Sequence, residues 1–193
     1  MDNPNSNKRL VKCIIDCETT GLNCFEHDMI QFAALPINDK CDTIMSPLNI
    51  RVKAITPESA CPLAMKVNGL DPTQGLSIDD SKVALASWMR ENSIEQIIPI
   101  AFNYIFDYGF INKWLTVCGI RYKEVFHYAH RDVFVLANCA NDAQRLRSQH
   151  ILFKSVSLAS VGKDLRIEHT QMHNALSDCY LTLEVYKKLL LIA

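Results

Sequence analysis

The sequence predicts an α/β fold in which helices cover a mixed sheet. Strand-forming apolar runs open the chain, helical periodicity takes over after position 103, and the breaks between segments are short. Three strands, a helix, a strand, a helix, a strand and further helices follow one another, which is typical of a mixed sheet. We find no internal repeat or low-complexity tract. A single domain over residues 10–193 is therefore expected, behind a mobile polar tail of residues 1–9.

Short runs rich in Val, Ile and other apolar residues mark the strands. The first run is apolar at nearly every position, which predicts a strand buried on both faces. The next two runs follow it at the spacing of hairpins. Pro99 argues mildly against a central place for the fourth strand, since proline cannot donate to a neighbouring strand. The predicted strands are residues 10–17, 29–37, 43–52, 97–102 and 125–128.

Apolar side chains at three- and four-residue steps mark the helices. Asp132 and Ser157 are expected to cap two of them, because their side chains can accept hydrogen bonds from first-turn N–H groups. Gly119 is expected to end the helix that precedes it. The predicted helices are residues 81–91, 103–118, 132–140, 157–161 and 175–190.

Composition and charge restrict the class of protein. The chain is 49% apolar and 21% charged, which is typical of a folded domain, and its formal net charge is −1. A polyanion must therefore be bound by local basic clusters or by cations. The eight cysteines form no Cys-x-x-Cys pair, which favours reduced thiols and a cytoplasmic location. No apolar run approaches the roughly twenty residues of a membrane span, so no membrane partner is expected.

Two carboxylates stand one residue apart at the end of the first strand. Side chains alternate along a strand, so Asp16 and Glu18 project on one side while Cys17 points to the other. Two like charges held together require a cation or a proton between them. Oxygen ligands suit Mg²⁺ or Mn²⁺, and the absence of a Cys/His cluster disfavours zinc. Gly21 permits a sharp turn that brings the backbone close to a ligand.

Two further acids and a histidine are expected at the same edge of the sheet. Asp107 falls in the first turns of the helix after the fourth strand, and Asp178 falls early in the last helix. Five helical residues turn through about 500°, so His173 and Asp178 would face apart on one helix. We therefore expect His173 in the preceding loop. Four carboxylates and a histidine are the components of two-metal phosphodiester hydrolysis.

Three motifs carry a resemblance to a known family. The segments Asp16-Cys17-Glu18-Thr19-Thr20-Gly21-Leu22, Asn103-x-x-Phe106-Asp107 and His173-x-Ala175-Leu176-x-Asp178 resemble those of the DEDDh (DnaQ-like) 3′→5′ exonucleases. Residues 55–71 also look like a stretch common in that family. The resemblance implies a ribonuclease H-like fold with a central five-stranded mixed sheet. It also implies two divalent cations, Mg²⁺ or Mn²⁺, and release of nucleoside 5′-monophosphates from a nucleic-acid 3′ end.

The resemblance also implies a role for each motif residue. Asp16, Glu18 and Asp178 would hold the ion that activates the nucleophile. Asp16 would bridge to a second ion, Asp107 would support it, and His173 would be the general base. Contact with the terminal nucleotide is expected from Thr19, Gly21, Leu22, Asn103 and Phe106. The chain departs from many relatives at Phe102, where they carry a histidine, and this alters only the rim of the nucleotide site.

Simpler interpretations of the same residues stay open. Asn103 could be a helix cap, Phe106 a core residue, and Leu22 a side chain packed on the fold. No partner is assigned to His27, His127, His130, His150 and His169. A basic cluster upstream of the third motif could follow a phosphate backbone or could be an ordinary solvated face. Its members are Arg145, Arg147, Lys154, Lys163 and Arg166.

The leading functional hypothesis is a 3′→5′ exonuclease that trims single-stranded DNA. Degradation of RNA is the second hypothesis, because no residue can be identified that reads a 2′-hydroxyl. A binding module without catalysis is disfavoured, since all four acids and the histidine are present. The sequence ends just past the last helix, so a free-standing nuclease is expected rather than a proofreading subunit, and a polymerase partner is left open.

Overall fold

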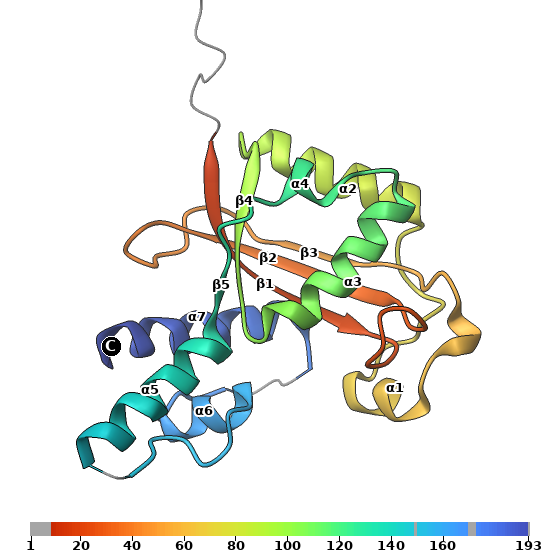
Figure 1. Cartoon of the computed structure of the whole chain (residues 1–193). Helices are drawn as coiled ribbons and strands as arrows, with labels where there is room; N and C mark the ends of the chain where they lie inside the picture. Colours follow the sequence, from red (N-terminus) through yellow and green to blue (C-terminus); the bar gives the residue numbers. More distant parts are fainter. Residues whose placement is uncertain (1–8, 149, 170–172, 193) are drawn as a thin grey trace, which may run out of the picture.

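A computed structural model of the chain describes residues 9–148, 150–169 and 173–192. It confirms the predicted α/β architecture, a five-stranded mixed sheet with helices on both faces (Figure 1). Residues 1–8 of the expected N-terminal tail lie outside the described residues. The strand order is β3-β2-β1-β4-β5, with β1 antiparallel to β2 and parallel to β4. The strands are β1 (Leu10–Thr19), β2 (Met29–Ile37), β3 (Leu48–Arg51), β4 (Gln96–Ala101) and β5 (Arg131–Asp132).

Helices form a layer on each face of this sheet, and each layer encloses its own hydrophobic core. Alternation along β1 divides its side chains between the two cores, with Cys13 and Ile15 on one face and Ile14 on the other. The first core includes side chains of α2, α3 and α4, and the second includes side chains of α5, α6 and α7. The helices are α1 (Pro62–Asn68), α2 (Ile78–Glu91), α3 (Tyr104–Val117), α4 (Tyr122–Val125), α5 (Val133–Ser148), α6 (Leu158–Asp164) and α7 (Ala175–Ile192). None of the helices in the described part of the chain combines the length and apolar character needed to cross a bilayer.

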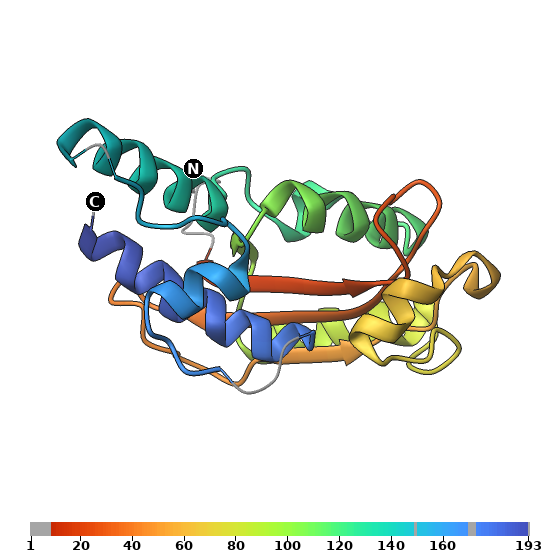
Figure 2. The ribbon, with the colours of Figure 1, turned by 90° about the horizontal axis from the view of Figure 1, so that it is seen from below.

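The parallel pair β1 and β4 separates before β1 ends. The two strands are paired from Leu10 and Gln96 as far as Ile14 and Ile100, and β1 then continues alone on that side to Thr19. The last residues of β1 therefore present an open edge toward α3. Helix α1 lies beyond the carboxyl end of β1 in both views of the ribbon (Figures 1 and 2). This is the edge at which open α/β sheets bind ligands.

Two strand predictions are wrong in extent or position. The predicted strand at 43–52 is reduced to the four residues of β3, because Pro47 interrupts the run and Thr43 makes only an isolated bridge to Ile37. The predicted fifth strand at 125–128 is also displaced. Residues 122–125 form α4, Phe126 makes a single bridge to Ile97, and the fifth strand is β5. The aromatic and β-branched residues there pack into the first core instead of forming a ladder.

Pro99 is compatible with a central strand here. On one side β4 is paired with β1, and on the other side its ladder with β5 begins only at Ile100. The missing N–H of Pro99 therefore precedes the β5 ladder, and a proline is tolerated there.

The two expected caps are confirmed, and one of them has a second role. Ser157 accepts a hydrogen bond from the Ser160 N–H at the start of α6. Asp132 accepts from the Phe134 N–H at 2.9 Å at the start of α5. Its carboxylate also accepts from the backbone N–H groups of Asn103 and Tyr104, each at 3.1 Å. Asp132 thus fixes the amino end of α3, the helix that carries Asp107.

We expect replacement of Asp132 by alanine to lower the free energy of unfolding by about 2 kcal/mol, since three N–H groups lose their acceptor. Urea unfolding followed by circular dichroism measures the loss. Asp132→Asn keeps an acceptor oxygen and should cost less. Asp39→Ala is the matched control, because Asp39 is an exposed carboxylate paired with Lys12 and solvent screening leaves such a pair little effect on stability. Equal losses for the two alanine variants would contradict the capping role.

Candidate active site

Three carboxylates from distant parts of the sequence converge at the open edge of β1. Asp16 and Glu18 come from β1 and Asp178 from the first turn of α7. One ligand oxygen from each lies within 4.8 Å of the others. The register between β1 and β2 shifts between Glu18 and Thr19, an irregularity of the kind that redirects side chains beside active sites. The structure thus brings these three acids together at one edge of the sheet.

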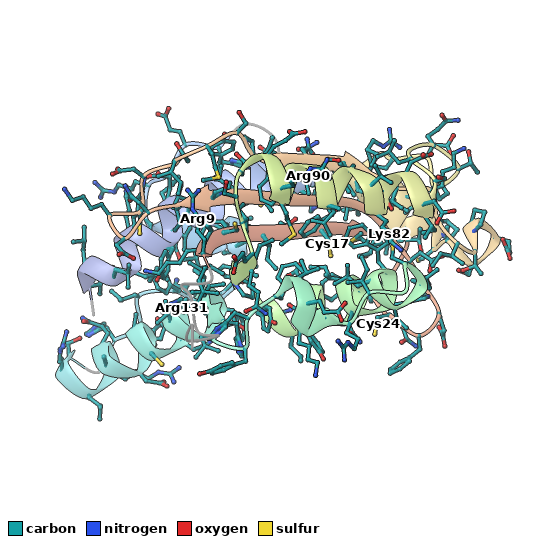
Figure 3. All side chains as sticks on the ribbon, turned by 90° about the horizontal axis from the view of Figure 1, so that it is seen from above. Arg9, Cys17, Cys24, Lys82, Arg90 and Arg131 are labelled. Atoms are coloured by element: carbon teal, nitrogen blue, oxygen red, sulfur yellow. The ribbon has the colours of Figure 1, made fainter. Side chains whose placement is uncertain are left out.

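Asp107 is the fourth expected acid, and it reaches β1 through the backbone. Its Oδ1 accepts a hydrogen bond from the Cys17 N–H at 3.0 Å, where β1 has lost β4 as a neighbour. The Cys17 side chain lies on the side of β1 that faces α3 (Figure 3), belongs to the first core and interacts with the Asp107 carboxylate. The Asp107 carboxylate therefore accepts a hydrogen bond that a carbonyl of a neighbouring strand would otherwise accept. This contact fixes the carboxylate beside that of Asp16.

Burial raises the pKa of all four carboxyl groups, and repulsion by the other acids adds to the shift at Asp16 and Glu18. Burial raises the pKa of Asp16 well above its ordinary value, and the charges of Asp107, Asp178 and Glu18 add to the effect. Burial likewise raises the pKa of Glu18 to about 7 and that of Asp107 to about 7, the hydrogen bond from Cys17 opposing the shift of Asp107. The pKa of Asp178 is raised by burial and is held back by the His173 N–H and by His169. Such a site favours protons or cations.

The segment before α7 places two histidines at Asp178. His173 precedes the helix, as predicted, and its backbone has a positive φ of 63°. Its N–H donates to Oδ2 of Asp178 at 3.1 Å, while its side chain is exposed. His169, to which the sequence assigned no partner, has its Nε2 3.4 Å from Oδ1 of Asp178. Local sequence gave no signal for His169, because this contact exists only once the segment folds back onto α7.

An apolar pocket of about 290 Å³ adjoins the acids, between the end of β1 and α1. Four of the expected nucleotide-contacting residues line it, namely Thr19, Gly21, Leu22 and Phe106. Leu22 is 86% exposed, so the idea that it packs on the fold is wrong. Phe106 lines the pocket and also packs on Phe110 at 4.9 Å between ring centroids, so both interpretations of this residue hold. Helix α1 supplies Leu63, Val67 and Asn68, which the sequence placed only in a stretch common to the family.

Asn103 and Gly21 were both expected to contact the terminal nucleotide, and the structure shows other constraints on each of them. Asn103 stands before α3 with a left-handed φ of 69°, its side chain makes no cap hydrogen bond, and it does not line the apolar pocket. Asp132 caps α3 in its place. At Gly21 a Cβ atom would lie 2.3 Å from the ring of His27, so glycine is required by that ring. His27 thereby gains a structural partner.

Phe102, the position at which the family resemblance leads us to expect a histidine, has a structural role here. Its ring packs edge-on against Phe134 of α5 with centroids 6.1 Å apart, and it borders the second core. The side chain thus stabilises the junction of β4 and α5.

The donor set suits a hard divalent cation. Three carboxylates, all with raised pKa, offer only oxygen atoms at mutual distances that one ion can span. Burial makes their mutual repulsion costly in the absence of a cation. Fold and site together define a metal-dependent hydrolase of nucleic acids with the ribonuclease H-like topology.

Comparison with known proteins identifies the family. The family model described as Exonuclease (RNase_T) matches residues 13–186, so the chain belongs to this family, which comprises DnaQ-like 3′–5′ exonucleases of ribonuclease H-like fold. The family depends on divalent metal ions, in agreement with the acid cluster. Ribonuclease T of Shewanella frigidimarina is 26% identical over 184 residues, which cover 90% of this chain and 79% of the relative. Ribonuclease T of Actinobacillus pleuropneumoniae is 23% identical, with 90% and 80% covered.

Solved structures with the same fold include exonuclease I. The Escherichia coli enzyme in complex with a dT13 oligonucleotide has a TM-score of 0.75 and 19% identity, covering 93% of this chain. A zinc-bound complex of the same enzyme with single-stranded DNA has a TM-score of 0.74 and 19% identity over the same share of the chain. Exonuclease I of Methylocaldum szegediense has a TM-score of 0.74 and 18% identity, again over 93%. The chain spans only about two fifths of these proteins, 41%, 40% and 40% respectively.

The raised pKa of Glu18 predicts how stability depends on pH without metal. The folded pKa of Glu18, about 7, exceeds the ordinary value of 4.5, so the protonated carboxyl group favours the folded state. This contribution of Glu18 to the free energy of unfolding is fully present below the ordinary pKa and is lost as pH rises through about 7. In EDTA at pH 8, Glu18→Gln should therefore raise the free energy of unfolding by about 2 kcal/mol, and at pH 4 it should have little effect. Thermal unfolding at both pH values measures this difference. Glu91→Gln, on the exposed end of α2, is the control, and destabilisation by Glu18→Gln at pH 8 would refute the repulsion.

Proposed function

We propose that this chain hydrolyses the terminal phosphodiester bond at the 3′ end of single-stranded DNA and releases a nucleoside 5′-monophosphate. The observation that carries the proposal is the convergence of Asp16, Glu18 and Asp178 within 4.8 Å, beside a pocket large enough for one nucleotide. A strand end fits this arrangement because the pocket is apolar and the acids stand at its rim.

The apolar pocket supports recognition of the last nucleotide. Its volume of about 290 Å³ and its apolar lining suit a single base and sugar. Leu22 projects from the loop after β1 and Phe106 from α3, so the two side chains can hold a base between them. The loop is anchored by the Thr20 N–H bound to the Asp28 carbonyl at 2.8 Å and by an ion pair between Asp28 and Lys113. Gly21 and Thr19 form the backbone floor beside Glu18.

The acids are proposed to hold two divalent cations, Mg²⁺ or Mn²⁺. Asp16, Glu18 and Asp178 would hold one, and Asp16 with Asp107 the other. When bound, the two ions lower the pKa of the attacking water and stabilise charge on the departing oxygen. Asp107 is held by Cys17 and Asp178 by His173 and His169, so these residues keep the carboxylates in place. The raised pKa values support the need for cations.

His173 is proposed as the general base. Water adds to phosphorus, the bond from phosphorus to O3′ of the preceding nucleotide breaks, and that oxygen gains a proton. The proton that leaves the water goes to the imidazole ring of His173, since histidine is the side chain that most often serves as a general base. Its exposed side chain and the backbone tie to Asp178 leave the ring free to turn toward the acids.

Two features bear on substrate and location. The exonuclease I structures hold single-stranded DNA, which favours DNA, whereas the curated relatives are named ribonuclease T, which makes RNA the second candidate. The cysteines of the described residues are all free, which supports a cytoplasmic, reducing environment.

Loss of the acids or of the base should stop the reaction. We expect Asp16→Ala to lower the rate on a labelled oligonucleotide in Mg²⁺ by at least about a thousandfold, because one carboxylate would contact both ions. His173→Ala should cost about 10²- to 10⁴-fold. His150→Ala, which alters an exposed histidine away from the acids, is the control. Persistent hydrolysis by purified Asp16→Ala protein would contradict the assignment.

The sugar preference is tested with DNA and RNA oligomers of one sequence. We expect DNA to be shortened faster, with nucleoside 5′-monophosphates as products in liquid chromatography. Much faster degradation of RNA would show that RNA, and not DNA, is the substrate. Products shortened from the 5′ end would contradict the proposed 3′→5′ direction of digestion.

A further inference from the structure

A second depression adjoins the acids and is lined by other elements than the apolar pocket. This groove of about 680 Å³ lies between α6 and α7, and charged or polar side chains border it, namely Lys163, Arg166, Glu168 and His169. His169 connects it with the acids, since its Nε2 lies 3.4 Å from Oδ1 of Asp178. Asp178 in turn is within 4.8 Å of Glu18, which lines the apolar pocket. The groove and the apolar pocket therefore both adjoin the acids, the groove through His169 and the pocket through Glu18.

The charges of the groove suit a polyanion. Lys163 and Arg166 are exposed, and neither makes an ion pair within the described part of the chain. Glu168 is the carboxylate on the lining. Lys188 adds a third cation nearby, its Nζ donating to the carbonyl of Leu165 at 2.7 Å. Since the net charge is −1 and the catalytic edge is acidic, a local excess of cations is what an incoming phosphate backbone requires.

The backbone conformation at Arg166 permits a variant that separates folding from binding. Helix α6 ends in a Schellman motif, in which the Arg166 N–H donates to the Lys163 carbonyl and the Ile167 N–H to the Gly162 carbonyl, both at 2.9 Å. Arg166 occupies the left-handed position of this motif, with φ of 55°, where glycine is the usual residue. An arginine there costs free energy that glycine would not, so replacement of Arg166 by glycine removes the side chain without destabilising the backbone.

We propose that this groove binds the phosphate backbone of the single-stranded nucleic acid on the 5′ side of the scissile bond, through Lys163 and Arg166. The inference rests on the proposed function, since a 3′ nucleotide in the apolar pocket places the scissile phosphate at the acids. The preceding phosphates then leave along the path past His169. Contacts of this type, made to the phosphate backbone, carry no sequence preference.

The decisive variant is Arg166→Gly, because it separates folding from binding. Glycine fits the left-handed position, so the melting temperature should stay equal to that of the wild type or rise. Binding of a labelled fifteen-nucleotide single strand, measured by fluorescence anisotropy in EDTA, should weaken about fivefold, and the salt slope of log Kd should fall by about 0.7. Lys163→Ala should behave in the same way. Arg166→Lys should recover most of the affinity.

Two controls isolate the groove. Ser93→Gly changes another left-handed residue, with φ of 52°, in the turn after α2, and should leave binding unchanged. Arg90→Ala removes one positive charge from α2, on the other face of the sheet (Figure 3), and should also leave binding unchanged. Equal weakening by Arg90→Ala would show that overall charge, and not the groove, attracts the strand.

Failure of this inference and failure of the proposed function have different signatures. A wild-type protein that shortens oligonucleotides, together with Arg166→Gly and Lys163→Ala proteins that keep its Kd and salt slope, overturns the groove alone. A wild-type protein that binds no single strand overturns the groove as well. A wild-type protein that binds strands but shortens none in Mg²⁺ or Mn²⁺ overturns the proposed function. If the groove binds the strand, kcat/KM of the Arg166→Gly protein should fall, relative to the wild type, more for long strands than for a dinucleotide. A dinucleotide lacks the upstream phosphates that the groove would contact.

Discussion

The confinement of four carboxylates in one buried cleft is the constraint on which the rest of the structure depends. Each oxygen that is brought out of water near another negative charge raises the free energy of the metal-free fold, and the raised pKa values of Asp16, Glu18 and Asp107 record this cost. The remainder of the protein holds the groups together in spite of it. A folded domain accepts such a cost where a bound cation offsets it.

The separation of β1 from β4 is how the fold creates this cleft. While the strands are paired, their backbone groups satisfy each other, and beyond Ile14 the free edge of β1 is bound by the Asp107 side chain at Cys17. Asp132 holds the amino end of α3 and thereby the turn that carries Asp107. Backbone hydrogen bonds thus position the acid of α3, and no rearrangement of the sheet is needed to form the site.

The segment between α6 and α7 joins chemistry to substrate contact. It presents His169 and the His173 N–H to the two oxygens of Asp178, and at its start Arg166 stands in a strained backbone conformation beside a large groove. The described residues of this connection therefore contact Asp178, a proposed metal ligand, include the proposed general base His173, and border the groove proposed to bind the strand. Such a concentration of roles explains why backbone conformations that are costly elsewhere occur here.

The sequence by itself determined the α/β class, most elements, the caps at Asp132 and Ser157 and the four acids, because local periodicity, capping chemistry and motif spacing are written along the chain. The tertiary structure alone decided the fifth strand, the pairing of His27 with Gly21, the exposure of Leu22 and the contact of His169 with Asp178. Those features depend on which residues meet across the fold. Residues such as 125–128 satisfy strand propensity and core packing equally well, and only their neighbours in space select between the two.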